Sequence, residues 1–208
     1  MAYAWDDPDL PFPPGLDSPA AIQELLDDLP YSVDPVYRCP ASVLRDRKAH
    51  CYDGAIFAAA ALRRLGFPPR IVEMLPEPGR DDDHLLAVFT LDGRWGAVGK
   101  SNYVGLRFRE PVYRDLRELM MSYFEAYYNV DGEKTLRGYT VPLSLKPFDR
   151  LRWTTRDEAL DAIAERLDQL RRVSILTPPM AARLSRLDRR SYEAGLMGAL
   201  QEGLYKLQ

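Results

Sequence analysis

The chain has 208 residues, of which 46% are hydrophobic and 28% are charged, a balance typical of a folded globular protein rather than a disordered one. Its formal net charge of −3 gives no electrostatic reason to expect nucleic acid or anionic lipid as a partner. The sequence holds no apolar run of the roughly 20 residues needed to span a bilayer.

The first eight residues are acidic and contain neither a basic leader nor an apolar stretch, so we expect no secretory signal and a cytoplasmic location. Two cysteines are too few for a disulfide framework in a chain of this length. We therefore expect Cys39 and Cys51 to be free thiols.

The predicted elements begin with an irregular, proline-rich arm over residues 1–17. Ser18 and Pro19 provide a cap and a first helical residue, and Pro30 ends the helix that they start. Residues 31–49 read as a loop with at most a short helical turn.

The most distinctive segment is the predicted helix over residues 51–65, because residues 54–62 are apolar on every side. Gly66 follows as a C-terminal cap, with prolines beyond it. A helix without a polar face is buried on most sides, so we expect it to be the central helix of the domain.

Strands are predicted after this helix, over residues 70–75, 84–91 and 94–98, and an extended piece over 139–145. The Asp-Gly pair at positions 92 and 93 joins the second and third strands as a hairpin. The remainder reads as mainly helical, with helices expected over 111–124, 155–170 and 178–204.

This order of elements predicts an α+β fold in which a buried helix packs on a small antiparallel sheet, with additional C-terminal helices. We expect a core over residues 1–150 that includes the N-terminal arm, and a helical extension over 151–208 that packs on it. Leucines in this extension form a short heptad-like run, which favours a homodimer only weakly.

Cys51 is the first candidate for chemistry, because it begins the buried helix and follows a basic run of Arg45, Arg47, Lys48 and His50. Helix N–H groups and nearby cations both favour a thiolate, so we expect a lowered thiol pKa. Alternatively, Cys51 is a small hydrophobic residue at a helix end.

His84 is the candidate base, because it opens a strand directly after a loop and imidazole exchanges protons near neutral pH. Alternatively, it is a histidine at a strand edge in contact with water. His50 is a rival base, but neighbouring residues on a helix diverge by about 100°, which turns it away from the sulfur.

Two segments resemble the transglutaminase-like superfamily, whose fold is related to that of papain. The first is His-Cys-Tyr-Asp-Gly-Ala at 50–55 with Leu-Arg-Arg-Leu-Gly-Phe-Pro-Pro-Arg at 62–70, and the second runs from His84 through Leu-Asp-Gly-Arg-Trp at 91–95. The resemblance covers residues 45–105. It implies that Cys51 attacks an acyl or amide carbonyl and that His84 transfers the proton.

The family pattern also includes an aspartate that orients the histidine, and in register this position is occupied by Gly99. Asn102 is the nearest group able to take that role, as asparagine does in papain-like enzymes, and Ser101 is a poorer choice. The aspartates at 81–83 are another possibility, although adjacent side chains on a strand point to opposite faces. Asn102 could equally be a turn residue.

The backbone N–H of Cys51 is the expected first donor to an oxyanion, and Arg45 lies where papain-like enzymes place a second donor. The aspartates at 81–83 lack the alternating spacing of a calcium loop. The sequence also shows no zinc spacing and no nucleotide fingerprint, so no metal or cofactor is expected.

The sequence therefore predicts a cysteine-dependent acyl transferase or amide or peptide hydrolase that acts on a peptide or protein. Cys51, His84 and Asn102 would form its catalytic group. The alternative is a non-catalytic transglutaminase-like protein that binds a peptide or protein partner in the same cleft.

Overall fold

The computed structural model describes residues 10–206. The first half of the predicted arm lies outside this range. Within the described part of the arm, Leu10 and Leu16 are buried in the main core, and the ring of Phe12 meets that of Phe57 edge to face at 5.8 Å. The arm thus adds apolar surface to the domain.

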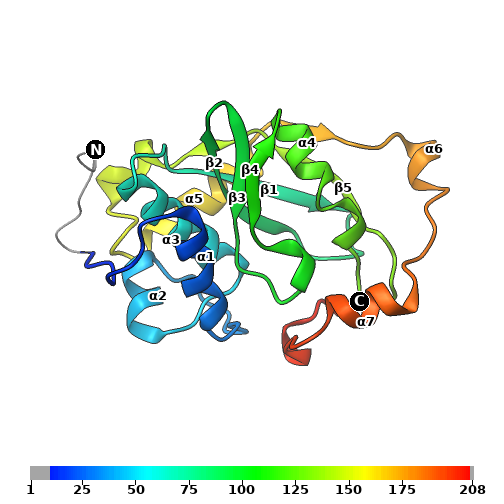
Figure 1. Cartoon of the computed structure of the whole chain (residues 1–208), viewed down its shortest axis with the longest axis horizontal. Helices are drawn as coiled ribbons and strands as arrows, with labels where there is room; N and C mark the ends of the chain where they lie inside the picture. The colour runs from blue at the N-terminus through cyan, green and yellow to red at the C-terminus, as the bar shows by residue number, and fades with distance from the viewer. Residues whose placement is uncertain (1–9, 207–208) are drawn as a thin grey trace.

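Two helices precede the central one (Figure 1). Helix α1 (Pro19–Asp28) begins as predicted, with the Ser18 hydroxyl accepting a hydrogen bond from the Ala21 N–H at 3.1 Å. Helix α2 (Pro40–Asp46) is longer than the turn expected between residues 31 and 49, because Pro40 fixes its first turn and Arg47 ends it in the left-handed conformation.

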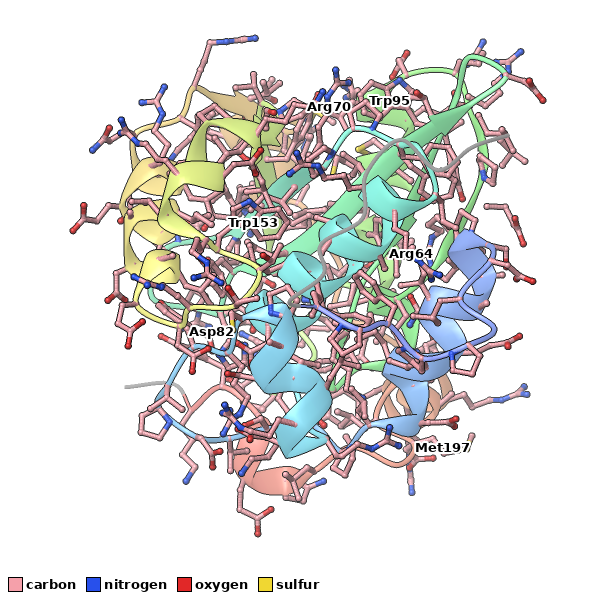
Figure 2. The ribbon with its side chains drawn as sticks, turned by 90° about the vertical axis from the view of Figure 1, so that its left-hand side faces the viewer. Arg64, Arg70, Asp82, Trp95, Trp153 and Met197 are labelled. Carbon is pink, nitrogen blue, oxygen red and sulfur yellow. The ribbon has the colours of Figure 1, made fainter. Side chains whose placement is uncertain are left out.

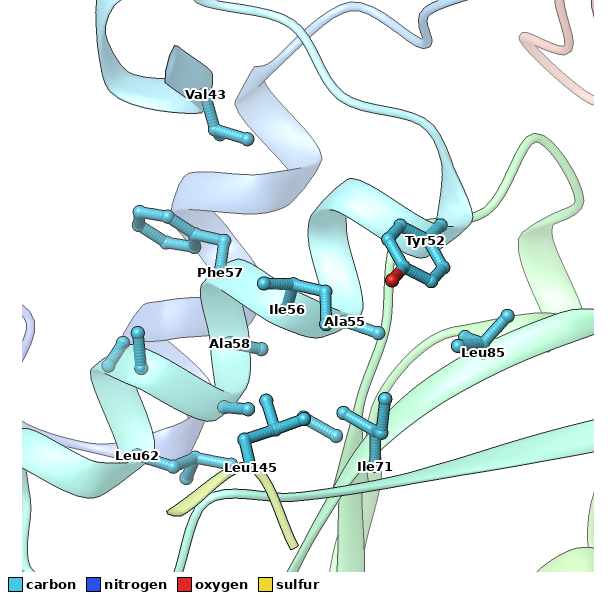
Figure 3. Packing of buried hydrophobic residues seen from close by; sticks show 14 of the residues in the cluster. Val43, Tyr52, Ala55, Ile56, Phe57, Ala58, Leu62, Ile71, Leu85 and Leu145 are labelled. Carbon is cyan, nitrogen blue, oxygen red and sulfur yellow. The ribbon is translucent and has the colours of Figure 1, made fainter. Parts of the chain in front are cut away.

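Helix α3 (Cys51–Arg64) is the predicted central helix, and its residues from Ala55 to Leu62 are buried. Figure 3 shows its Ala55, Ile56 and Leu62 lying among Ile71, Leu85 and Leu145 of the sheet side. A Cβ at Gly54 would lie 2.3 Å from the Cβ of Lys100, so only glycine allows this approach. Lys100 then donates to the carbonyls of Leu26 and Leu29, at the end of α1.

The strands are β1 (Arg70–Pro76), β2 (His84–Leu91), β3 (Arg94–Val98), β4 (Arg109–Tyr113), β5 (Leu136–Thr140), β6 (Leu143–Ser144) and β7 (Arg172–Ser174). They form a sheet that is antiparallel at every pairing, with strand order β4-β3-β2-β1-β5-β7, and β6 also pairs with β1. The predicted strands over 84–91 and 94–98 are confirmed, with a turn in which Asp92 and Gly93 both have positive φ.

Each face of the sheet carries its own core. On one face α1, α2, α3 and α5 (Ala159–Asp168) enclose one cluster of buried hydrophobic residues. Trp153, which precedes α5 and is labelled in Figure 2, belongs to this cluster. On the other face lies a second cluster, to which α4 (Leu116–Met121) and the residues that follow it up to Tyr127 contribute. The α+β fold and the buried helix on a small sheet are therefore as predicted.

The chain after residue 100 differs from the sequence prediction in two places. The helix expected over 111–124 is split, because residues 109–113 pair with β3 as an edge strand, and α4 begins only after the Asp115 cap. The C-terminal part is not only helical, because β7 joins the sheet beside β5. Sheet pairing supplies backbone hydrogen bonds that local sequence patterns do not reveal.

The single helical stretch predicted over 178–204 is also wrong, since residues 182–188 are not helical and Gly198, with φ +74°, ends the helical region after residue 195. Its parts are α6 (Pro178–Ala181), α7 (Arg189–Gly195) and the 3-10 turn η4 (Gln201–Gly203); the other 3-10 turns are η1 (Val104–Leu106), η2 (Phe124–Ala126) and η3 (Lys146–Leu151). Between residues 10 and 206, no helix has both the length and the apolar character to cross a bilayer.

Candidate active site

A pocket of about 400 Å³ opens where α3 and β2 both begin, and Cys51 and His84 both line it. In Figure 2, Asp82 of this pocket lies well below Arg70 and Trp95, which are labelled at the top of the molecule. The antiparallel sheet explains this placement, since residues 70 and 95 lie at the far ends of β1 and β3. The structure thus brings together the two side chains predicted to carry the chemistry.

The backbone N–H groups of Leu85 and Tyr52 lie close enough to the Cys51 sulfur to favour its thiolate form. These contacts lower the thiol pKa, but burial, followed by the charges of Asp83 and Asp82, outweighs them and raises it to about 12. The expectation of a lowered thiol pKa is therefore wrong. In this arrangement the resting sulfur is protonated near neutral pH.

Two cations of the basic run before Cys51, Arg45 and Lys48, are paired with carboxylates away from the sulfur. Arg45 Nε lies 2.7 Å from Asp46 Oδ1, and Lys48 Nζ lies 2.7 Å from Asp34 Oδ2. Neither residue is among the leading influences on the pKa of Cys51. The predicted role of Arg45 as an oxyanion donor is not supported either, because Arg45 is not among the residues that line the pocket.

The pocket is instead acidic and aromatic. Among the described residues that line it are five carboxylates and seven tyrosines, but no lysine or arginine: Asp34, Asp81, Asp82, Asp83, Glu202, Tyr31, Tyr37, Tyr52, Tyr103, Tyr127, Tyr128 and Tyr205. A negative field disfavours the thiolate and would favour a positively charged group entering the pocket. Within residues 10–206, no three His, Cys, Asp or Glu side chains are grouped in a way that could hold a metal ion.

His84 is buried, and its Nε2 lies 2.8 Å from the carbonyl oxygen of Leu106 in η1. Because a carbonyl only accepts, Nε2 carries the hydrogen and Nδ1 remains the basic nitrogen. Burial lowers the pKa of His84 to about 4, while the Leu106 contact and the Asp83 charge act in the opposite direction. The imidazole is therefore neutral near pH 7.

Gly99 occupies the position that its sequence register predicts. A Cβ at position 99 would lie 3.6 Å from His84 Nε2, so a carboxylate there would reach the ring. Gln23 of α1 fixes this backbone, accepting from the Gly99 N–H at 3.1 Å and donating to its carbonyl at 2.9 Å. The missing carboxylate is replaced by the Leu106 carbonyl, which orients the ring without supplying charge.

Asn102 lines the pocket but does not orient His84. Its Nδ2 donates to the Leu200 carbonyl and its Oδ1 accepts from the Leu200 N–H, each at 2.8 Å. The predicted contact with the imidazole is thus wrong, because the amide is bound to the C-terminal part of the chain. Ser101, the second choice, accepts a hydrogen bond from the Tyr103 N–H.

His50 is a helix cap and not a base. Its Nδ1 accepts from the N–H groups of Tyr52 and Asp53 at 3.1 and 3.4 Å, and the Asp53 carboxylate accepts from the His50 N–H at 3.3 Å. This reciprocal pair satisfies the free N–H groups that begin α3. Burial, with the nearby Arg38 charge, lowers the pKa of His50 to about 4, which keeps Nδ1 free to accept.

Tyr31 is a site residue that the sequence did not reveal. Its hydroxyl interacts with both the thiol and the backbone N–H of Cys51, which is the expected oxyanion donor. Tyr31 reaches α3 because residues 31 and 49 form an isolated parallel bridge. The aspartates at 81–83 do not hold the His84 ring, whose Nε2 is bonded to Leu106; Asp81 Oδ2, for example, accepts from Thr135 Oγ1 at 2.6 Å.

A buried helix begun by a cysteine, packed on an antiparallel sheet that presents a histidine to the same pocket, defines an α+β protein with a thiol–imidazole site. The sequence model of the Transglutaminase-like superfamily matches residues 17–99, so this segment of the chain is similar to that superfamily. The match includes Cys51 and His84 and ends at Gly99, before Asn102. No curated protein matches the chain.

Proposed function

We propose that the protein catalyses cysteine-dependent acyl transfer, or amide or peptide hydrolysis, on a peptide or protein. The observation that carries this proposal is that Cys51 and His84 line the same pocket, each at the start of its element. The superfamily match over the same two residues supports it.

In the proposed reaction, the Cys51 sulfur attacks the carbonyl carbon as His84 Nδ1 takes the thiol proton. Collapse of the tetrahedral intermediate forms a thioester and breaks the bond to the leaving amine, which receives that proton. Water or a second amine then attacks the thioester and restores the thiol. Because both groups are neutral at rest, proton transfer accompanies attack and does not precede it.

The oxyanion would be stabilised by the backbone N–H of Cys51, which stands at the positive end of α3. The Tyr31 hydroxyl, which already interacts with this N–H, would be the second donor. Burial, the first cause, raises the pKa of Tyr31, so its hydroxyl keeps its proton and can donate.

A second candidate is a non-catalytic protein that binds a peptide or protein in the same pocket. It is favoured by the raised thiol pKa and by the carbonyl of Leu106 at the place of a carboxylate. Both features weaken a nucleophile and its base, whereas the pocket itself would serve binding as well as catalysis.

Acetylation by p-nitrophenyl acetate separates the two candidates. We expect an acetyl group on Cys51 by peptide mass spectrometry, released with time in the wild type, absent in Cys51→Ala and formed at least tenfold more slowly in His84→Ala. Cys39→Ala is the matched control, because Cys39 is buried at the cap of α2, away from the pocket. Equal, slow acetylation of Cys51 in the wild type and in His84→Ala would favour the binding protein.

A further inference from the structure

The contact between Asn102 and Leu200 joins residues 98 positions apart in the chain. One side-chain amide donates to the carbonyl and accepts from the N–H of the same residue, both at 2.8 Å. A side-chain amide bonded in this way replaces the backbone partner that a neighbouring strand would supply, so the contact is independent of the side chain at position 200. The Leu200 side chain is in fact exposed.

The residues after Leu200 continue along the pocket. Residues 202–205 line it together with Cys51 and His84. A Cβ at Gly203 would lie 3.0 Å from Asn102 Nδ2 and 3.1 Å from the ring of Tyr31, the tyrosine whose hydroxyl touches the thiol. The 200–205 segment therefore lies against Asn102 and Tyr31 at the wall of the thiol pocket.

The segment is extended at the residue that meets Asn102. Leu200 and Leu204 are extended, with φ and ψ of −79° and 117°, and −88° and 139°, on either side of the short turn η4. Asn102 pairs with both main-chain groups of Leu200, and the Leu200 carbonyl also accepts from the Gly203 N–H of the turn at 3.0 Å. Asn102 is itself mostly buried, at 9% exposure, which strengthens such hydrogen bonds.

We propose that Asn102 is the docking residue for peptide backbone in the thiol pocket, and that the 200–205 segment occupies this position as an internal peptide ligand. The class of ligand is a peptide that is extended where it meets Asn102 and is recognised there by its main chain. The inference that Asn102 binds a peptide substrate rests on the proposed function of the pocket. It implies that a peptide substrate must displace the segment, which limits access to Cys51.

Leu200→Pro tests the contact in the full chain. Proline fits the φ of −79° at this position but lacks the N–H that Asn102 Oδ1 accepts. We expect Cys51 to react with iodoacetamide several-fold faster in this variant at pH 8. Gly203→Leu should do the same by steric conflict with Tyr31, and Met197→Ala, at a residue 74% exposed, is the control.

The docking role is tested by adding the peptide Ala-Leu-Gln-Glu-Gly-Leu-Tyr-Lys, the sequence of residues 199–206. It should slow alkylation again in Leu200→Pro but have no effect when Asn102→Leu is added to the same chain. Unchanged alkylation in both folded variants, as judged by circular dichroism, would overturn the internal ligand. Faster alkylation without protection by the peptide would overturn docking at Asn102. Neither readout requires turnover, so a failure of the proposed catalysis remains distinguishable.

Discussion

Gly99 stands beside the imidazole of His84: a Cβ at this position would lie 3.6 Å from Nε2 and 2.6 Å from Leu86 Cδ2. The position that carries the orienting carboxylate in the family pattern is thus beside the ring but has no side chain. The Leu106 carbonyl holds Nε2 in its place. Because a carbonyl bears no charge, it stabilises an imidazolium less than a carboxylate would.

Restoring the carboxylate should raise the pKa of His84. We expect Gly99→Asp, in a Leu86→Ala background that makes room for it, to raise that pKa from about 4 by about 1–3 units. The chain has only two histidines, so their ring signals can be followed individually by NMR titration. Gly99→Asn in the same background is the uncharged control, and an equal shift in both variants would show that burial, not charge, had changed.

The thiol should respond to Asp83, whose charge is the largest influence on the Cys51 pKa after burial. Removing it in Asp83→Asn favours the thiolate, so alkylation of Cys51 at pH 8 should rise by up to about tenfold for each unit by which the pKa falls. Asp92→Asn, in the hairpin at the other end of β2, is the matched control. If Cys51 is alkylated equally fast in the two variants, the charge of Asp83 does not control the pKa of the thiol.

The cap formed by His50 should affect stability. His50→Ala should lower the free energy of unfolding by about 1 kcal/mol, whereas His50→Asn, whose side chain also caps, should recover most of the loss. Since the pKa of His50 is lowered to about 4, its contribution is complete above the unfolded value near 6.5 and is lost as the pH falls through 4. Urea unfolding at pH 7.5 and pH 4 measures both effects. A similar loss in the alanine and asparagine variants would argue against capping.

Glu73 should make the protein less stable at high pH. It is buried on β1 and its Oε2 has no hydrogen-bond partner among residues 10–206. Burial, followed by the neighbouring Asp83 carboxyl, raises the pKa of Glu73 to about 9. The folded state therefore holds the proton more tightly, and stability falls as the pH rises from about 4.5 toward 9.

Glu73→Gln removes this ionisation. We expect the free energy of unfolding of the variant, relative to the wild type, to rise by at least about 1 kcal/mol between pH 5 and pH 8.5, which corresponds to about one pKa unit. Urea unfolding at the two pH values measures it. The exposed Glu110→Gln, on edge strand β4, should leave the pH dependence unchanged. A constant difference between Glu73→Gln and the wild type at both pH values would show that the carboxyl does not titrate in this range.

The sequence alone determined the helix and the hairpin that carry the site. The uninterrupted apolar run predicts α3, the Asp-Gly pair predicts the β2–β3 hairpin, and the register after Trp95 predicts that position 99 lacks the orienting carboxylate. These features depend on interactions between near neighbours in the chain, which local patterns report well. Cys51 and His84 lie in the same pocket because they begin two such elements.

Only the tertiary structure decided the electrostatics and the partners of these residues. The pKa of Cys51 depends on burial and on Asp83, which lies 32 positions away, so the adjacent basic run was a misleading signal. Asn102 meets Leu200 and not His84, because the chain returns to the pocket after α7. Burial, charge distance and long-range pairing arise only when remote segments pack together, and no local pattern encodes them.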